Sequence, residues 1–185
     1  MYYTLQELKK LGVKKIGKFV KISNLVKFYN FKGSIGDHSR IDDYVILKGN
    51  INIGKQVHIS SFCILSATNI KSSITIGDFT GISAQTAIYA VTDDFMGNFL
   101  GNPTIKKKYT KPQMGHLKIG RCCFIGLKST LLPKCNLKDF VSISANSVVN
   151  EKVETGYIFV QRAKNKLVKI KDINKLIKSL KRYKS

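Results

Sequence analysis

A six-residue period in aliphatic side chains constrains the fold of this chain more than any other feature. These residues are Ile35, Ile41, Leu47, Ile53, Ile59 and Leu65, then Ile76, Ile82 and Ile88, then Ile119, Ile125, Leu131, Leu137, Ile143 and Val149. An earlier stretch with Ile16, Ile22 and Phe28 slips by one residue before Ile35. Neither an α-helix nor a hairpin meander has this period. Hexapeptide repeats are typical of a parallel β-helix, in which three repeats of about eighteen residues make one coil.

A second column of residues follows four positions after each aliphatic and holds small or β-branched side chains such as Val57. Side chains alternate in and out along a short strand, so both columns point into the core. Glycine often comes directly after the aliphatic, as at Gly54, where the chain turns between flat faces. Cys63, Cys123 and Cys135 lie in the small column, so we interpret them as core residues with free thiols.

The sequence at the two ends and at two interruptions differs from the repeat. Thr4 and Glu7 have the spacing of a helix capping box, and Asp172 is placed to cap a second helix near the C-terminus. A short loop is expected at 68–72, and a longer one contains the residues TDDFMGNFLGNPTIKKKYTKPQMGH. A loop of that length in a compact repeat is usually either functional or disordered, and its aromatic residues favour function. The predicted divisions are an N-terminal helix at 1–12, a β-helix at 13–160 with a long loop at 92–116, and a basic C-terminal segment at 161–185 that ends in a helix.

The net charge is +21, and 43% of the residues are hydrophobic. Such a basic surface attracts polyanions, so a non-catalytic polyanion-binding module is one candidate function and peripheral contact with an anionic membrane is another expectation. No run interleaves aromatic with basic residues as nucleic-acid readers do, so nucleic acid is not an expected partner. The sequence shows no signal peptide and no apolar run long enough for a membrane span, which predicts a cytoplasmic location.

Histidines and carboxylates supply the candidates for chemistry. His58 precedes an inward aliphatic, so its imidazole is expected to point outward, where it is suited to take the proton of an attacking hydroxyl. Asp93 and Asp94 begin the long loop and either only mark a turn, or act in a site by orienting a histidine or binding the acceptor's hydroxyls, while His116 closes the same loop. We therefore predict His58 as the base, with Asp93 or Asp94 as its partner. His38, His58 and His116 occupy different columns, so no metal site is predicted.

Three segments resemble the hexapeptide-repeat acyltransferases, within the sugar O-acetyltransferase branch that includes galactoside, maltose and surface-polysaccharide enzymes. They are Ile76 to Ser83, Thr92 to Pro103, and Ser144 to Val149. The resemblance implies an all-β fold, a left-handed parallel β-helix with short terminal helices. It also implies a homotrimer that binds acetyl-CoA between coils of neighbouring subunits.

The resemblance also assigns residues to the site. In the galactoside and maltose enzymes a loop histidine is the base, and Asp93 stands at or beside that position here. The residues that it implies for the acetyl-CoA site are Gly126, Ser144, Ala145 and Lys164. Those that it implies for the acceptor site are Ser60, Tyr89, Asn102 and His116.

The main prediction is an acetyltransferase that moves an acetyl group from acetyl-CoA to a sugar hydroxyl, in lipopolysaccharide, O-antigen or capsule biosynthesis. The alternative is N-acetylation of a nucleotide-linked amino sugar. A neutral amine is already nucleophilic, so that reaction needs less help from a base.

Overall fold

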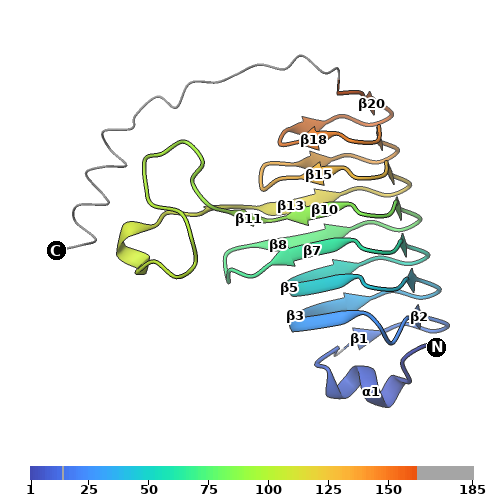
Figure 1. Cartoon of the computed structure of the whole chain (residues 1–185). Helices are drawn as coiled ribbons and strands as arrows, with labels where there is room; N and C mark the ends of the chain where they lie inside the picture. The colour runs from blue at the N-terminus through green and yellow to red at the C-terminus, as the bar shows by residue number, and fades with distance from the viewer. Residues whose placement is uncertain (14, 162–185) are drawn as a thin grey trace. The chain divides into compact units, whose positions relative to one another are not determined.

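The computed structural model describes residues 1–13 and 15–161. The predicted C-terminal helix and the predicted role of Lys164 lie outside these residues. The described chain is an all-β parallel β-helix, consistent with the left-handed form, with one short α-helix before it (Figure 1). The fold predicted from the six-residue period is confirmed.

The coils stack strand on strand to make three flat faces (Figure 1). Face 1 contains β1 (Lys15–Ile16), β8 (Ser73–Ile76), β13 (His116–Ile119), β16 (Asn136–Leu137) and β19 (Lys152–Val153). Face 2 contains β2 (Lys21–Ile22), β4 (Arg40–Ile41), β6 (His58–Ile59), β9 (Gly81–Ile82), β14 (Phe124–Ile125), β17 (Ser142–Ile143) and β20 (Ile158–Phe159). Face 3 contains β7 (Ile64–Ala67), β10 (Ala87–Tyr89), β15 (Thr130–Leu131) and β18 (Val148–Val149). The long strands β3 (Lys27–Ile35) and β5 (Ile46–Ile53) run through faces 3 and 1 and join them into one sheet.

The aliphatic ladder of the sequence sets the register of these strands. On face 2, Ile41 pairs with Ile59, Ile59 with Ile82, and Ile82 with Ile125 in neighbouring coils. The one-residue slip near the start of the ladder is a register shift in the β3–β5 pairing, between Tyr29 and Lys32. The repeat therefore continues through the irregularity.

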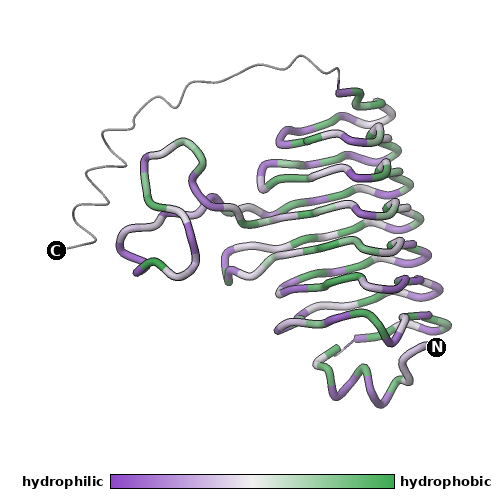
Figure 2. The backbone as a smooth tube through the Cα atoms, viewed as in Figure 1, coloured by the Kyte–Doolittle hydropathy of each residue, from purple (hydrophilic) through white to green (hydrophobic). Residues whose placement is uncertain are grey.

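The interior holds both inward columns, and the hydropathy of the coils alternates accordingly along the backbone (Figure 2). The hydroxyls of the small column donate to carbonyls of the next coil, since Ser39 Oγ lies 2.9 Å from the Gly54 oxygen and Thr80 Oγ1 lies 2.9 Å from that of Gly120. Pairing of this kind removes the cost of burying a polar group. Cys63, Cys123 and Cys135 are buried free thiols, as their place in the column predicts.

The corners between faces contain residues with left-handed backbone. The corner between faces 1 and 2 has Phe19, His38, Gln56, Phe79, Cys122 and Phe140, with φ between 52° and 62°. The next corner has Tyr44, Phe62, Gln85, Lys128 and Asn146, with φ between 56° and 63°. These side chains repeat from coil to coil, so they form columns along each corner.

The N-terminal end of the coils is covered by the helix α1 (Leu5–Lys10). Its capping box is present, because the Thr4 hydroxyl accepts from the Glu7 amide and the Glu7 carboxylate accepts from the Thr4 amide. Leu8 and Val13 are buried and belong to the core cluster of the first coils. The helix therefore shields the open end of the repeat.

The long loop, residues 92–113, forms a compact unit of its own. At its base β11 (Val91–Thr92) pairs with β12 (Gln113–Met114), and it contains a short 3-10 helix, η1 (Lys107–Tyr109). Within the loop, the Leu100 amide donates a hydrogen bond to the backbone carbonyl oxygen of Tyr109. The regular coil resumes at β13, which begins at His116, the last residue of the predicted loop.

Candidate active site

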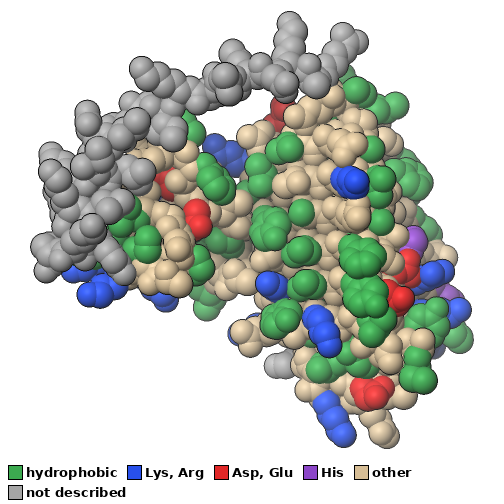
Figure 3. All heavy atoms as spheres, viewed as in Figure 1, with side chains coloured by type: hydrophobic (Ala, Val, Ile, Leu, Met, Phe, Trp, Pro, Cys, Tyr) green, Lys and Arg blue, Asp and Glu red, His purple; other side chains and the backbone are tan. Residues whose placement is uncertain are grey.

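His58 lies on β6 with its imidazole exposed on face 2, as strand alternation predicts. Its Nε2 is 2.8 Å from Asp42 Oδ2, and Arg40 Nε is 2.6 Å from the other oxygen of the same carboxylate. Figure 3 shows histidine side chains beside acidic and basic ones at one edge of the coil stack. The described hydrogen-bond partner of His58 is thus Asp42, and the expected pairing with Asp93 or Asp94 stays a prediction.

The Asp42 carboxylate is 16% exposed and carries a perturbed pKa. Burial raises this pKa, but the hydrogen bonds and charges of His58 and Arg40 together outweigh burial, so the net pKa is lowered from its ordinary value. Asp42 is therefore ionised near neutral pH and fixes the orientation of His58.

A column of small polar residues adjoins this pair. Ser60 and Ser83 follow the paired residues Ile59 and Ile82, so they occupy the same place as Asp42 in successive coils, and both are half-buried. Gly81 is in register with His58. Gly81 has no side chain, and the ring of Phe124 in the next coil lies 3.5 Å from where its Cβ would stand.

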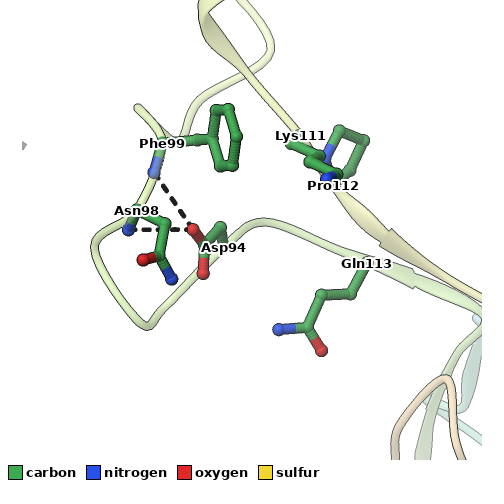
Figure 4. A pocket seen from close by; sticks show the side chains of 6 residues that line it. All are labelled: Asp94, Asn98, Phe99, Lys111, Pro112 and Gln113. Atoms are coloured by element: carbon green, nitrogen blue, oxygen red, sulfur yellow. Dashed lines mark hydrogen bonds between the residues drawn. The ribbon is translucent and has the colours of Figure 1, made fainter. Parts of the chain in front are cut away.

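The adjacent loop carboxylates differ in what they contact. Asp94 accepts hydrogen bonds from three loop amides, at 2.9 Å from Met96 N and 3.0 Å from both Asn98 N and Phe99 N (Figure 4). Asp94 therefore closes a turn, the simpler of its two sequence interpretations. Within the described chain, nothing donates a hydrogen bond to the Asp93 carboxylate, which is half-buried beside Gly101. Asp93 keeps its oxygens free for a ligand.

A hollow of about 570 Å³ lies within the loop (Figure 4). The Phe99 ring faces Lys111, whose Nζ is 5.4 Å from the ring centroid, and Gln113 projects from β12 at its border. An apolar ring with charged and amide groups at its edge is suited to a polar organic ligand.

The remaining predicted acceptor residues belong to different elements, two of them in the coils and one in the loop. Tyr89 is half-buried on β10 of face 3, and His116 is exposed on β13 of face 1, where its Nδ1 is 2.9 Å from Ser73 Oγ. Asn102 closes a turn in the loop, with its Oδ1 2.9 Å from both Thr104 N and Thr104 Oγ1. The roles of Tyr89, Asn102 and His116 in binding the acceptor stay predictions.

Gly126, Ser144 and Ala145, which were predicted for acetyl-CoA, lie in two consecutive coils. An added Cβ at Gly126 would stand 2.4 Å from Ala145 N, so glycine is required for the coils to stack there. Ser144 Oγ is 2.8 Å from Ser147 Oγ, and Ala145 is exposed.

Within residues 1–13 and 15–161, no group of three or more His, Cys, Asp or Glu side chains is arranged to hold a metal ion. None of the helices in that part of the chain has the length and apolarity needed to cross a bilayer.

Comparison with known proteins identifies the family. The chain is 36% identical to a dTDP-4-amino-4,6-dideoxy-D-glucose acyltransferase of Escherichia coli, over 80% of this chain and 78% of that enzyme. Hexapeptide coils make up residues 15–161 of the described chain apart from the loop at 92–113. The chain belongs to the hexapeptide-repeat acyltransferases.

Solved structures of this acyltransferase family extend the likeness to the whole chain. AntD, an N-acyltransferase from Bacillus cereus crystallised with dTDP and 3-hydroxybutyryl-CoA, is 35% identical over 100% of this chain and 98% of its own, with a TM-score of 0.78. The bifunctional protein GlmU of Campylobacter lari is 27% identical over 88% of this acyltransferase, which spans 38% of GlmU. No protein-family model matches the chain.

These comparisons bear on the predicted function. Membership of an enzyme family supports acyl transfer over the polyanion-binding module. The sugar O-acetyltransferase branch is not confirmed, and the relatives support the N-acyl alternative better than the main prediction.

Two residues of interest were not predicted from the sequence. Asp42 is the partner of His58 because His58 pairs with Arg40 across the strands and Asp42 lies two positions beyond Arg40. That signal was present in the eighteen-residue coil, but it becomes visible only when the coils are aligned. Ser83 lay within a quoted family-like segment without an assigned role.

Proposed function

We propose that this acyltransferase moves an acyl group from acyl-CoA to the amino group of a nucleotide-linked amino sugar. The observation that carries the proposal is the 36% identity to the E. coli dTDP-4-amino-4,6-dideoxy-D-glucose acyltransferase. AntD supports it independently, since an AntD variant is crystallised with dTDP-4-amino-4,6-dideoxyglucose and coenzyme A and matches this chain with a TM-score of 0.77.

The reaction needs little covalent help from the protein. The neutral amine attacks the carbonyl carbon of the thioester, a C–N bond forms, the C–S bond breaks, and a proton from nitrogen ends on the sulfur of CoA. The products are an amide and CoA thiol. A neutral amine is nucleophilic without a base, so the protein must chiefly hold the amine uncharged and aligned with the thioester.

We assign the amine contact to Asp93. AntD variants crystallised with the nucleotide ligands are changed at a serine and at an aspartate ten positions later. Ser83 and Asp93 have the same residue types, order and spacing here, at almost the same place in a chain of nearly the same length. Asp93 also has the unoccupied carboxylate of the loop pair, whereas Asp94 is used by the turn.

In this proposal His58 is not the general base. Its Nε2 is already hydrogen-bonded to an ionised carboxylate, and the amine chemistry does not require an imidazole base. Gly126, Ser144, Ala145 and Lys164 remain proposed for the acyl-CoA, and the homotrimer stays a prediction.

The test measures the release of CoA thiol by the full-length protein with two acceptors. One is dTDP-4-amino-4,6-dideoxyglucose, and the other is the matched nucleotide sugar with a hydroxyl at the same carbon. Acetyl-CoA and 3-hydroxybutyryl-CoA are compared as donors, because the proposal does not specify which acyl group is transferred. Release that requires the amine supports the proposal, and equal or greater release with the hydroxyl acceptor contradicts it.

A further inference from the structure

Two columns of side chains run in parallel from the middle of face 2 towards the N-terminal coils. The first is basic, since Lys21 pairs with Arg40 and Arg40 with His58 in strand register, followed by Gly81. The second occupies the adjoining corner, where the rings of Phe19 and His38 stack with centroids 4.9 Å apart and an interplanar angle of 24°.

The N-terminal ends of the two columns enclose a hollow of about 460 Å³. It is lined by Phe19, Lys21, His38, Ser39 and Arg40. Stacked rings stand on one side and cations on the other, so the hollow offers both contacts that a nucleotide needs.

The aromatic side is open to a base. Phe19 is 74% exposed, so stacking on His38 leaves much of its surface in solvent. Its backbone has a φ of 56°, which places it at the corner and away from the core. Stacking on such a ring is available to any nucleobase, because every base has a π-face.

The basic side is open to phosphate. Lys21 forms no ion pair with any residue that the structure describes. Arg40 uses Nε for Asp42, and its two terminal nitrogens make no hydrogen bond to the described chain. A guanidinium with free terminal N–H groups is well suited to bind phosphate oxygens.

The length of the columns matches an extended nucleotide sugar. The strands of Lys21 and Gly81 are three steps apart on face 2, a distance of about 14 Å at the usual strand spacing. Ser83, which matches the serine changed in an AntD variant crystallised with the nucleotide sugar, is two residues beyond Gly81. A sugar near Ser83 would therefore extend its diphosphate past His58 towards Arg40 and Lys21.

We infer that this hollow binds the nucleoside diphosphate of the acceptor, with the base against Phe19 and His38 and the phosphates on Arg40 and Lys21. The inference rests on the proposed function, because it takes the acceptor to be nucleotide-linked. CoA also carries a base and phosphates, so the test must separate the two ligands.

The experiment is calorimetric titration of the full-length protein with dTDP and, separately, with CoA. The variants are Phe19→Asn, since asparagine tolerates a left-handed backbone, and Arg40→Met. Matched controls are Phe140→Asn, at the same corner with a φ of 62°, and Arg121→Met, whose guanidinium is also paired with an aspartate, Asp139. A further variant, Tyr29→Ala, tests whether dTDP binds instead in a second hollow, of about 830 Å³, which Tyr29 lines near another corner. Circular dichroism checks that every variant is folded.

Phe19→Asn and Arg40→Met are each expected to weaken dTDP binding by about tenfold while CoA binding is unchanged. The two control variants are expected to bind dTDP as the wild type does. Unchanged dTDP affinity in Phe19→Asn and Arg40→Met, or a loss confined to Tyr29→Ala, would overturn the inference even if the amino sugar is acylated. A loss of CoA affinity in place of dTDP affinity would assign the hollow to the donor. If the wild type neither binds dTDP nor acylates the amino sugar nucleotide, the proposed function itself fails.

Discussion

Asp93 and Asp94 are neighbours in the chain, yet only one of them has oxygens free for a substrate. The Asp94 carboxylate accepts hydrogen bonds from three loop amides, whereas none of the described residues donates a hydrogen bond to the Asp93 carboxylate. Of two identical residue types, the one that the backbone does not use is the better candidate for chemistry.

At the residue scale, Asp93→Asn is expected to lower kcat for the amino sugar about a hundredfold, because the neutral amide cannot accept the proton that the nitrogen loses as it attacks the thioester. His58→Gln is the comparison, and its kcat is expected to stay within about threefold of the wild type. Steady-state kinetics with both substrates saturating measure the two variants. A large loss in His58→Gln with little change in Asp93→Asn would restore the histidine as the base.

The lowered pKa of Asp42 predicts a specific response to acid. A carboxyl whose pKa is lower in the folded than in the unfolded protein stabilises the fold above its unfolded pKa of about 3.9, and this stability is lost as the pH falls through the folded pKa. The difference in free energy of unfolding between wild type and Asp42→Asn should therefore be greatest near neutral pH and shrink in acid. Urea unfolding at several pH values measures it, and a difference independent of pH would contradict the assignment.

At the scale of the strand and coil, glycines differ in how closely the next coil approaches. An added Cβ at Gly126 would stand 2.4 Å from Ala145 N, whereas at Gly81 the nearest atom is a Phe124 ring carbon at 3.5 Å. Gly126→Ala is expected to cost about 2 kcal/mol or more of unfolding free energy, and Gly81→Ala much less. Urea denaturation compares the two variants. Equal stabilities would mean that the coils adjust more easily than their spacing implies.

The strands and the core are the part of the structure that a repeat makes predictable. Each aliphatic such as Ile59 recurs at a fixed interval, so strand register, inward columns and the buried thiol of Cys63 follow from one period. The His58–Asp42 pair depends on side chains in adjacent coils, and the period alone does not say which outward residues meet. The use of Asp94 in a turn depends on loop backbone that follows no period.

At the scale of the whole molecule, the β-helix and the long loop are separate compact units. All strand pairs of the three faces lie in residues 1–91 and 114–161 of the described chain. Replacing residues 93–112 with a short Gly/Ser linker should therefore leave the β-helix folded, with Tm within about 5 °C of the wild type. Acyl transfer should be lost, since Asp93 is removed. Calorimetry and the thiol assay measure the two effects, and collapse of the fold would show that the loop supports the coils.

Whether oxygen or nitrogen is acylated was the least predictable property. The coils build the same scaffold for both reactions, and a fold does not specify the atom that its site acylates. Likeness over 80% of the chain to an acyltransferase of a dTDP-linked amino sugar, and over all of it to the N-acyltransferase AntD, shifted the proposal from a hydroxyl to an amine.

The most direct test of this account is to locate the new acyl group in the product. The protein is incubated with dTDP-4-amino-4,6-dideoxyglucose and acyl-CoA, and the purified product is analysed by mass spectrometry and NMR before and after treatment with hydroxylamine. The account predicts one acyl group bound to the sugar nitrogen as an amide, with an N–H coupled to the ring proton and no loss to hydroxylamine. An acyl group on a ring oxygen, released by hydroxylamine as an ester, would contradict it.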